Sequence, residues 1–300
     1  MEVEKLLTEQ RNPVSMNLDT CSTIEMVELI NSEDQKVARA IATQAHEIAQ
    51  AIDQVSERFN QGGRLIYCGA GTSGRLGILD AVELVPTYGI DPKRAIGLIA
   101  GGQNAVYRSV EGAEDSAELA KKDLQHLNLN EYDSVFSLAA SGRTPYAIGA
   151  LEAAKQVGAL AIAVACVADS RMSKYADVTI APLVGPEVVT GSTRMKAGSA
   201  QKMVLNTIST GVMVRAGKVY QNLMVNVLPT NEKLMNRAIH IIAQTTNCDL
   251  KTAQQMLINA ERNVPAAIIM QRTKLSLPVS KKLLKENNYK VADALNSFRK

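Results

Sequence analysis

Short runs of apolar residues, separated by stretches with helical spacing, constrain the fold more than any other feature of this sequence. The runs cover residues 65–68, 95–99, 134–139 and 160–166, and a fifth follows at 178–181. They are apolar almost throughout instead of alternating with polar residues, which is typical of parallel strands covered by helices on both faces. The sequence therefore predicts an α/β fold in three layers, with a parallel sheet in the middle.

Helices are predicted on both sides of these runs. Ser32 and Gln35 have capping-box spacing, and apolar residues recur with helical periodicity over 37–59. A mostly apolar helix is predicted over 193–216, and only short helical patterns follow residue 231. We therefore expect an N-terminal helical segment at 1–54, a sheet domain at 55–218 and a small all-helical domain at 219–300.

Charge and cysteine usage favour a small-molecule partner inside the cell. The net charge of +3 is too small to indicate binding to nucleic acid or to a membrane surface. The four cysteines lie far apart without a C-x-x-C pair, which is typical of reduced thiols. Residues 1–13 contain no apolar signal region, and the longest apolar run, 160–168, is too short to span a bilayer. A cytoplasmic location is expected.

A glycine-rich loop follows the first predicted strand. Residues 69–74 read GAGTSG and precede a predicted helix at 75–85, so backbone N–H groups and two hydroxyls gather where an anion would bind. The loop also fits the dinucleotide pattern G-x-G-x-x-G. That pattern requires an acidic residue at the end of the second strand, where this chain has residues 100–102, AGG. A phosphate loop is favoured, and a turn needed only for packing is the alternative.

Two further loops carry the same residue types. Residues 140–144, ASGRT, follow the third strand and precede Pro145, a typical first residue of a helix. Residues 190–193, TGST, precede the long apolar helix, although hydroxyl residues are also ordinary helix caps. Loops at the carboxyl ends of parallel strands meet in one crevice. We predict a phosphosugar site formed by Gly71, Thr72, Ser73, Ser141, Gly142, Arg143, Thr144 and Ser192.

The motifs are specific enough to suggest a family. They are GGRLIYCGAGTSGRLGILDA from Gly62, PTYG from Pro86, GLIAGG from Gly97, VEGAEDS from Val110, AASGRTPY from Ala139, VVTGSTRMKAGSAQK from Val188, and NLMVNV and TNEKL between Asn222 and Leu234. Nearly end to end, the chain resembles the N-acetylmuramic acid 6-phosphate etherases of the sugar isomerase (SIS) superfamily. The resemblance implies a flavodoxin-like SIS domain and a homodimer.

The resemblance also implies a reaction and two catalytic residues. The family converts N-acetylmuramic acid 6-phosphate and water to N-acetylglucosamine 6-phosphate and D-lactate, by elimination at C3 and addition of water. The family's pair of acids corresponds to Glu83, as proton donor to the lactyl oxygen, and Glu114, as base at C2. From the residues alone, either could be a solvated glutamate, and Asp80, Glu111 and Asp115 are close enough in sequence to be confused with them.

Other features leave alternatives open. No metal or cofactor is implied, because the three histidines lack ligand spacing. The role of Lys196 is undecided between binding a sugar oxygen or phosphate and facing solvent. The resemblance extends to the glucokinase regulatory protein, which binds phosphosugars without chemistry, so a non-catalytic regulator is one alternative function. An aldose–ketose isomerase is another, and it would not need the second acid.

Overall fold

The computed structural model describes residues 7–229 and 231–299. The start of the segment searched for a signal sequence, residues 1–6, lies outside the described residues. The chain folds into two compact units, one of Met1–Val82 and Lys93–Ser209 and the other of Glu83–Pro92 and Thr210–Lys300. Helices α3 (Gly71–Tyr88) and α7 (Lys196–Arg215) contain residues of both units. The domain boundaries expected from the sequence stay a prediction.

The first unit contains the parallel sheet that the apolar runs predict. Its strands are β1 (Leu65–Gly69), β2 (Ala95–Ile99), β3 (Ser134–Leu138), β4 (Leu160–Val164) and β5 (Val178–Ile180). They pair in parallel in the order β2-β1-β3-β4-β5. This is the strand order of flavodoxin, in which the chain reverses direction across the sheet between β1 and β3. The five predicted strands are therefore confirmed.

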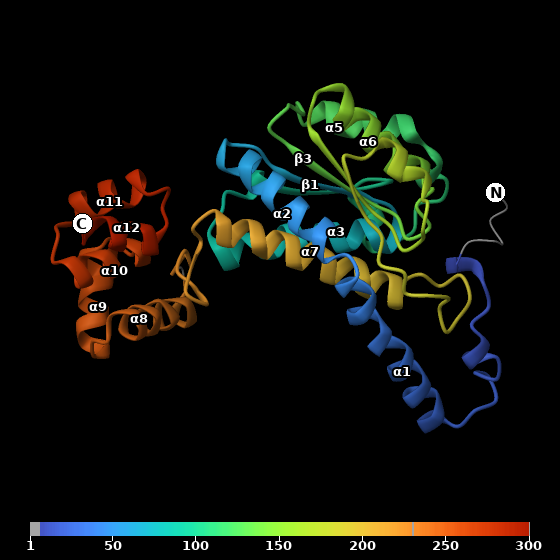
Figure 1. Cartoon of the computed structure of the whole chain (residues 1–300), viewed down its shortest axis with the longest axis horizontal. Helices are drawn as coiled ribbons and strands as arrows, with labels where there is room; N and C mark the ends of the chain where they lie inside the picture. The colour runs from blue at the N-terminus through green and yellow to red at the C-terminus, as the bar shows by residue number, and fades with distance from the viewer. Residues whose placement is uncertain (1–6, 230, 300) are drawn as a thin grey trace. The chain divides into compact units, whose positions relative to one another are not determined.

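Helices cover both faces of the sheet, which confirms the three layers. Helices α5 (Ala117–His126) and α6 (Pro145–Gln156) lie on one face, and α2 (Ala45–Asn60), α3 and α7 lie on the other (Figure 1). All residues of β1, β3 and β4 are buried. This double coverage is the physical reason for the continuous apolar runs in the sequence.

The N-terminal region differs from the expectation in where its helices begin. The 3-10 helices η2 (Leu7–Glu9) and η3 (Pro13–Ser15) precede α1 (Thr23–Ala42). The capping box is formed by Ser22 and Glu25, so the start predicted at Ser32 is wrong, because Ser32 lies inside α1. The remaining short elements of this unit are η4 (Pro92–Arg94), α4 (Asn104–Tyr107), η5 (Ala113–Asp115) and η6 (Arg171–Tyr175).

The second unit is mainly helical. Its helices are α8 (Glu232–Thr246), α9 (Leu250–Asn259), α10 (Val264–Thr273), α11 (Leu277–Glu286) and α12 (Val291–Phe298), packed around a cluster that includes Ile242, Leu257 and Ile268. A short antiparallel ribbon, β6 (Val219–Tyr220) with β7 (Leu223–Met224), was not predicted, because two-residue strands carry no periodic pattern. Across residues 7–229 and 231–299, no helix is long and apolar enough to cross a membrane.

Candidate active site

The predicted crevice exists as a cavity of about 440 Å³ in the first unit, where β1 and β3 end. Neighbouring parallel strands deliver their following loops to the same edge of the sheet, and β1 and β3 are paired along their full length. The cavity is lined by Glu9, Ala70, Gly71, Thr72, Ser73, Glu114, Asp115, Leu138, Ala139, Ala140, Ser141, Arg143, Thr144, Pro145 and Thr193. Most of the predicted binding residues therefore lie together.

The first loop forms the amino end of α3 at the cavity. Helix α3 begins at Gly71, whose φ of 52° lies in the left-handed region that favours glycine. The turn is tight, since a Cβ on Gly69 would lie 2.8 Å from the backbone nitrogen of Gly74. The first N–H groups of a helix have no carbonyl partner within it, and the helix dipole adds partial positive charge. This end of α3 is suited to an anion.

Ser73 lines the cavity and is also hydrogen-bonded to helix α7. Its side chain is 9% exposed, and its hydroxyl donates to Oε1 of Gln201 on α7 at 2.8 Å. Because that proton is shared with Gln201, the Ser73 oxygen faces a ligand mainly as an acceptor. Donors to an anion in this loop therefore come from backbone N–H groups and from Thr72.

The second loop is shaped by Gly142. Its φ is 64°, and a Cβ there would lie 2.2 Å from the Cβ of Ser170, so no larger residue fits without movement. Gly142 shapes the turn and is not one of the lining residues. Pro145 is the first residue of α6, as predicted, and Thr144 at the cap position makes no side-chain capping bond. The Thr144 hydroxyl is thus not used as an ordinary helix cap.

The charged side chains of the lining are one cation and three acids. Arg143 is the one basic residue among the described lining residues, and the acids are Glu114, Asp115 and Glu9. Glu114 belongs to η5, which follows Gly112 with its φ of 72°. Glu114 and Asp115 are both exposed. Position at the cavity therefore does not separate these two neighbours, and only the family resemblance favours Glu114.

Two predicted residues do not line this cavity. Ser192 is half-buried in the loop beside Thr193, which does line it. Glu83 is exposed on α3, twelve residues after Gly71, which corresponds to roughly 18 Å along a helix. The roles proposed for Glu83 and Ser192 stay predictions.

One lining residue, Glu9, lies in a segment where the sequence predicts no site. It belongs to η2 and is half-buried, whereas its neighbour Thr8 is 1% exposed. The segment before Pro13 has neither a periodic pattern nor a glycine loop, so no local signal indicates a site there. Lys196, whose role was undecided, is 1% exposed and forms an ion pair with Glu33, so the solvent-facing interpretation is wrong.

Comparison with known proteins indicates the same family as the sequence motifs. Residues 47–155 match the family described as "Glucokinase regulatory protein N-terminal SIS domain", and residues 111–210 match the SIS domain. The chain is 59% identical to N-acetylmuramic acid 6-phosphate etherase of Lactobacillus gasseri, over 99% of this chain and 100% of that protein. It is 51% identical to the etherase of Clostridium beijerinckii, over 99% and 98% of the two chains.

Among solved structures, a phosphoheptose isomerase from Francisella tularensis superposes with a TM-score of 0.49 at 13% identity, covering 65% of this chain and 100% of that one. No functional conclusion follows from a likeness at that level. The full-length identity to the etherases and the SIS matches over the sheet are sufficient, and on that basis the chain belongs to the N-acetylmuramic acid 6-phosphate etherase family of the SIS superfamily.

Proposed function

We propose that this protein is a carbon–oxygen lyase that converts N-acetylmuramic acid 6-phosphate and water to N-acetylglucosamine 6-phosphate and D-lactate. The observation that carries the proposal is identity above 50% to etherases over essentially the whole chain. The chemistry of the cavity agrees with such a substrate, because it combines an anion-binding helix end with hydroxyl, guanidinium and carboxylate groups. The reaction serves the catabolism of cell-wall amino sugars.

The loops are proposed to hold the phosphate. The amino end of α3, the hydroxyls of Thr72, Ser141 and Thr144, and Arg143 supply donors to a phosphate at the carboxyl edge of the sheet. Ser73, Gly142 and Ser192 support this binding through loop structure or through further hydroxyl contacts. Anchoring the phosphate here leaves the sugar carbons to extend toward the acids at the cavity.

Glu114 is proposed to remove the proton at C2. In the ring-opened sugar, the C1 aldehyde acidifies this proton, and a carboxylate can accept it. The electron pair of the C2–H bond forms the C2–C3 double bond while the C3–O bond breaks. The unsaturated aldehyde then takes water at C3, which gives N-acetylglucosamine 6-phosphate.

Glu83 is proposed to protonate the leaving lactyl oxygen and later to activate the water. An alkoxide leaves poorly at neutral pH, so one carboxyl must start protonated while the other starts ionised. Glu83→Gln should suppress D-lactate release while still allowing solvent deuterium to enter C2. Glu114→Gln should suppress both. Unchanged lactate release by Glu83→Gln would refute the assignment.

The active form is proposed to be a homodimer. Because Glu83 does not line the cavity that Glu114 lines, we expect the two acids of a working site to come from different copies. Chains carrying Glu83→Gln and chains carrying Glu114→Gln, each inactive alone, should then regain about a quarter of wild-type activity after mixing, through dimers with one intact site. No recovery despite exchange of subunits would place both acids in one chain.

A cytoplasmic location is also proposed. The four cysteines are free thiols, and burial raises the pKa of Cys68 and raises that of Cys166 to about 12, so neither is prone to oxidation. Free thiols are typical of proteins in a reducing compartment.

The decisive experiment is incubation of the purified protein with N-acetylmuramic acid 6-phosphate, followed by assay of D-lactate. Stoichiometric lactate is the expected result. Binding of the phosphosugar without lactate release would favour a regulator instead. Interconversion of an aldose and a ketose phosphate would favour an isomerase.

A further inference from the structure

Part of the cavity wall comes from the N-terminal segment, residues 7–15. Glu9 lines the cavity together with the phosphate loops. Its carboxylate also lies beside the 190–193 loop, since a Cβ on Gly191 would be 3.5 Å from Oε2 of Glu9. The hydroxyl of buried Thr8 donates to Oε1 of Glu9 at 3.2 Å. A carboxylate thus stands at the cavity on a segment far in sequence from the loops.

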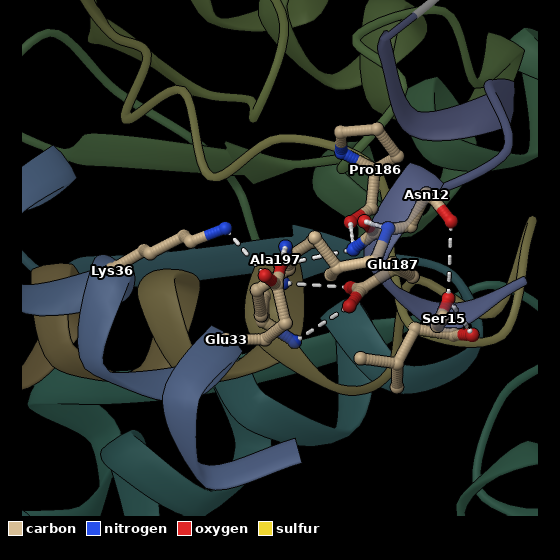
Figure 2. Close-up of polar contacts among 10 residues, drawn as sticks. Asn12, Ser15, Glu33, Lys36, Pro186, Glu187 and Ala197 are labelled. Atoms are coloured by element: carbon tan, nitrogen blue, oxygen red, sulfur yellow. Dashed lines mark hydrogen bonds and ion pairs between the residues drawn. The ribbon is translucent and has the colours of Figure 1, made fainter. Parts of the chain in front are cut away.

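Asn12 fixes this segment to the body of the first unit. It is 5% exposed, and its amide donates to Oε2 of Glu33 at 2.9 Å and to the carbonyl of Pro186 at 3.1 Å. Its oxygen accepts from the backbone N–H of Val14 at 3.1 Å. Three residues later, the Ser15 hydroxyl donates to the carbonyl of Val188 at 2.8 Å (Figure 2). These bonds attach the segment to α1 and to the loop that leads to Thr193.

Beneath Asn12 lies a buried ion pair. The ammonium of Lys196 is 2.5 Å from Oε2 of Glu33, and the two side chains are 2% and 3% exposed. Lys36 donates to the other oxygen of Glu33 (Figure 2). Removing two charges from water is costly, so such pairs are weak evidence for stability and better explained by the geometry that they impose.

Glu187 completes the anchor at the start of α7. Its two carboxylate oxygens accept from the backbone N–H groups of Lys196 and Ala197 at 3.0 and 2.9 Å. It is 1% exposed. The segment before α1, helix α1, the loop before Thr193 and α7 are thus held together by one buried polar network.

The position of Glu9 restricts what it can bind. An ionised carboxylate only accepts hydrogen bonds, and it repels a phosphate. In a cavity whose loops are suited to an anion, it must therefore face the uncharged part of the ligand. Sugar hydroxyls are donors of the right kind, and hydrogen bonds to a charged acceptor are stronger than those between neutral groups.

We propose that Glu9 is a substrate-binding residue that accepts hydrogen bonds from the hydroxyl groups of the phosphosugar, and that Asn12, Glu33 and Lys196 are positioning residues that hold it at the cavity. The proposal rests on the proposed function for the class of ligand. It assigns to the N-terminal segment the recognition of the sugar, while the strand-end loops recognise the phosphate. A site built to bind a hydroxyl discriminates strongly against ligands that lack it.

Calorimetric titration with N-acetylglucosamine 6-phosphate and with inorganic phosphate tests this division. Glu9→Gln should weaken binding of the sugar phosphate by about tenfold to a hundredfold. Its affinity for inorganic phosphate should stay the same or rise, because a negative charge is removed. Glu57→Gln, at an exposed position of α2, is the matched control and should change neither affinity.

Two results for Glu9→Gln would overturn the proposal. One is wild-type affinity of Glu9→Gln for the sugar phosphate. The other is an equal loss for both ligands, since that would indicate a damaged cavity instead of a lost sugar contact. Failure of the wild-type protein to bind any of a panel of hexose 6-phosphates would contradict it as well.

The positioning role has its own test. Asn12→Ala should weaken sugar-phosphate binding but not phosphate binding, and it should add little to Glu9→Gln in the double variant, because both act through the same carboxylate. If the losses of binding free energy in the two single variants add up in the double variant, Asn12 does not act through Glu9. Wild-type protein that binds the sugar phosphate but releases no D-lactate would refute the etherase function, and the result for Glu9→Gln would still decide the role of Glu9.

Discussion

The two walls of the cavity are built in different ways. The loop wall, formed by the loops at 70–73 and 140–145, follows directly from β1 and β3 and presents backbone turns, short hydroxyl side chains and the guanidinium of Arg143. The N-terminal wall consists of Glu9, on a segment held by bonds that span 21 residues to Glu33 and 174 residues to Pro186. The position of the first wall follows from the adjacent strands, whereas that of the second depends on a few buried polar contacts.

Because of this difference, substitutions in the two walls should act in different ways. A substitution in the loop wall should act locally, through backbone strain or lost ligand contacts. A substitution in the network below Asn12 should act through an unpaired buried charge. Substitutions in each wall therefore separate local effects from the loss of a buried charge partner.

The largest effect is expected from Lys196→Met, which leaves the Glu33 carboxylate buried without its main cationic partner. The free energy of unfolding should fall by about 3 to 5 kcal/mol in chemical denaturation. Lys202→Met, on the exposed side of the same helix, is the control and should change it by about 0.5 kcal/mol or less. Equal effects of the two variants would mean that the buried pair does not anchor the N-terminal wall.

The same network should make stability depend on acid pH. Burial acts to raise the pKa of Glu33, but hydrogen bonds from Lys196, Lys36 and Asn12 outweigh it and lower the pKa from 4.5 to about 2. Because the folded form has the lower pKa, this stabilisation is complete above pH 4.5 and is lost as the pH falls toward 2. Its size is roughly 3 kcal/mol.

Denaturation of the wild type and of Glu33→Gln between pH 6 and pH 2.5 would measure this contribution. The difference in unfolding free energy between them should shrink as the pH falls. A difference independent of pH would contradict the proposed charge state of Glu33.

Within the loop wall, Gly142→Ala should reduce the unfolding free energy by about 2 kcal/mol, through the positive φ and the collision with Ser170. Gly102→Ala is a suitable comparison, because Gly102 has a φ of 70° but nothing lies within 4 Å of an added Cβ. Its cost should be about 1 kcal/mol, from the backbone conformation alone. If both variants lose the same stability, contact with Ser170 does not define the turn.

The smallest effect on stability is expected when the loop wall loses hydroxyls. The double change Ser141→Ala and Thr144→Ala should leave unfolding nearly unchanged but weaken phosphosugar binding about tenfold. Calorimetric titration measures the affinity, and inorganic phosphate should be affected in parallel. Unaltered affinity would contradict the assignment of this loop to the phosphate.

The difference between the two walls also explains which parts of the structure can be predicted from the sequence. The strands and the loops after β1 and β3 were predictable, because burial on both faces produces continuous apolar runs and the loops follow directly from them. Even Pro145 marks the start of α6 correctly. These signals all lie within a few residues of the structure that they predict.

Glu9 and Lys196 could not be placed from the sequence. Their positions depend on partners such as Glu33, 163 residues from Lys196, and no local pattern encodes that distance. The capping box shows the limit even for local signals, since both Ser22 and Ser32 have suitable spacing and only one begins a helix. The motif that contains Glu83 likewise does not specify where this side chain lies relative to a substrate.

The cap that Glu187 provides for α7 has a consequence for ligand binding. The eight residues between Glu187 and Lys196 form a loop closed at its base by two charge-assisted hydrogen bonds, and this loop carries Thr193 to the cavity. Much of its conformational freedom is already lost when the protein folds. The loop is therefore preorganised before the substrate binds, and ordering it takes up little of the binding free energy.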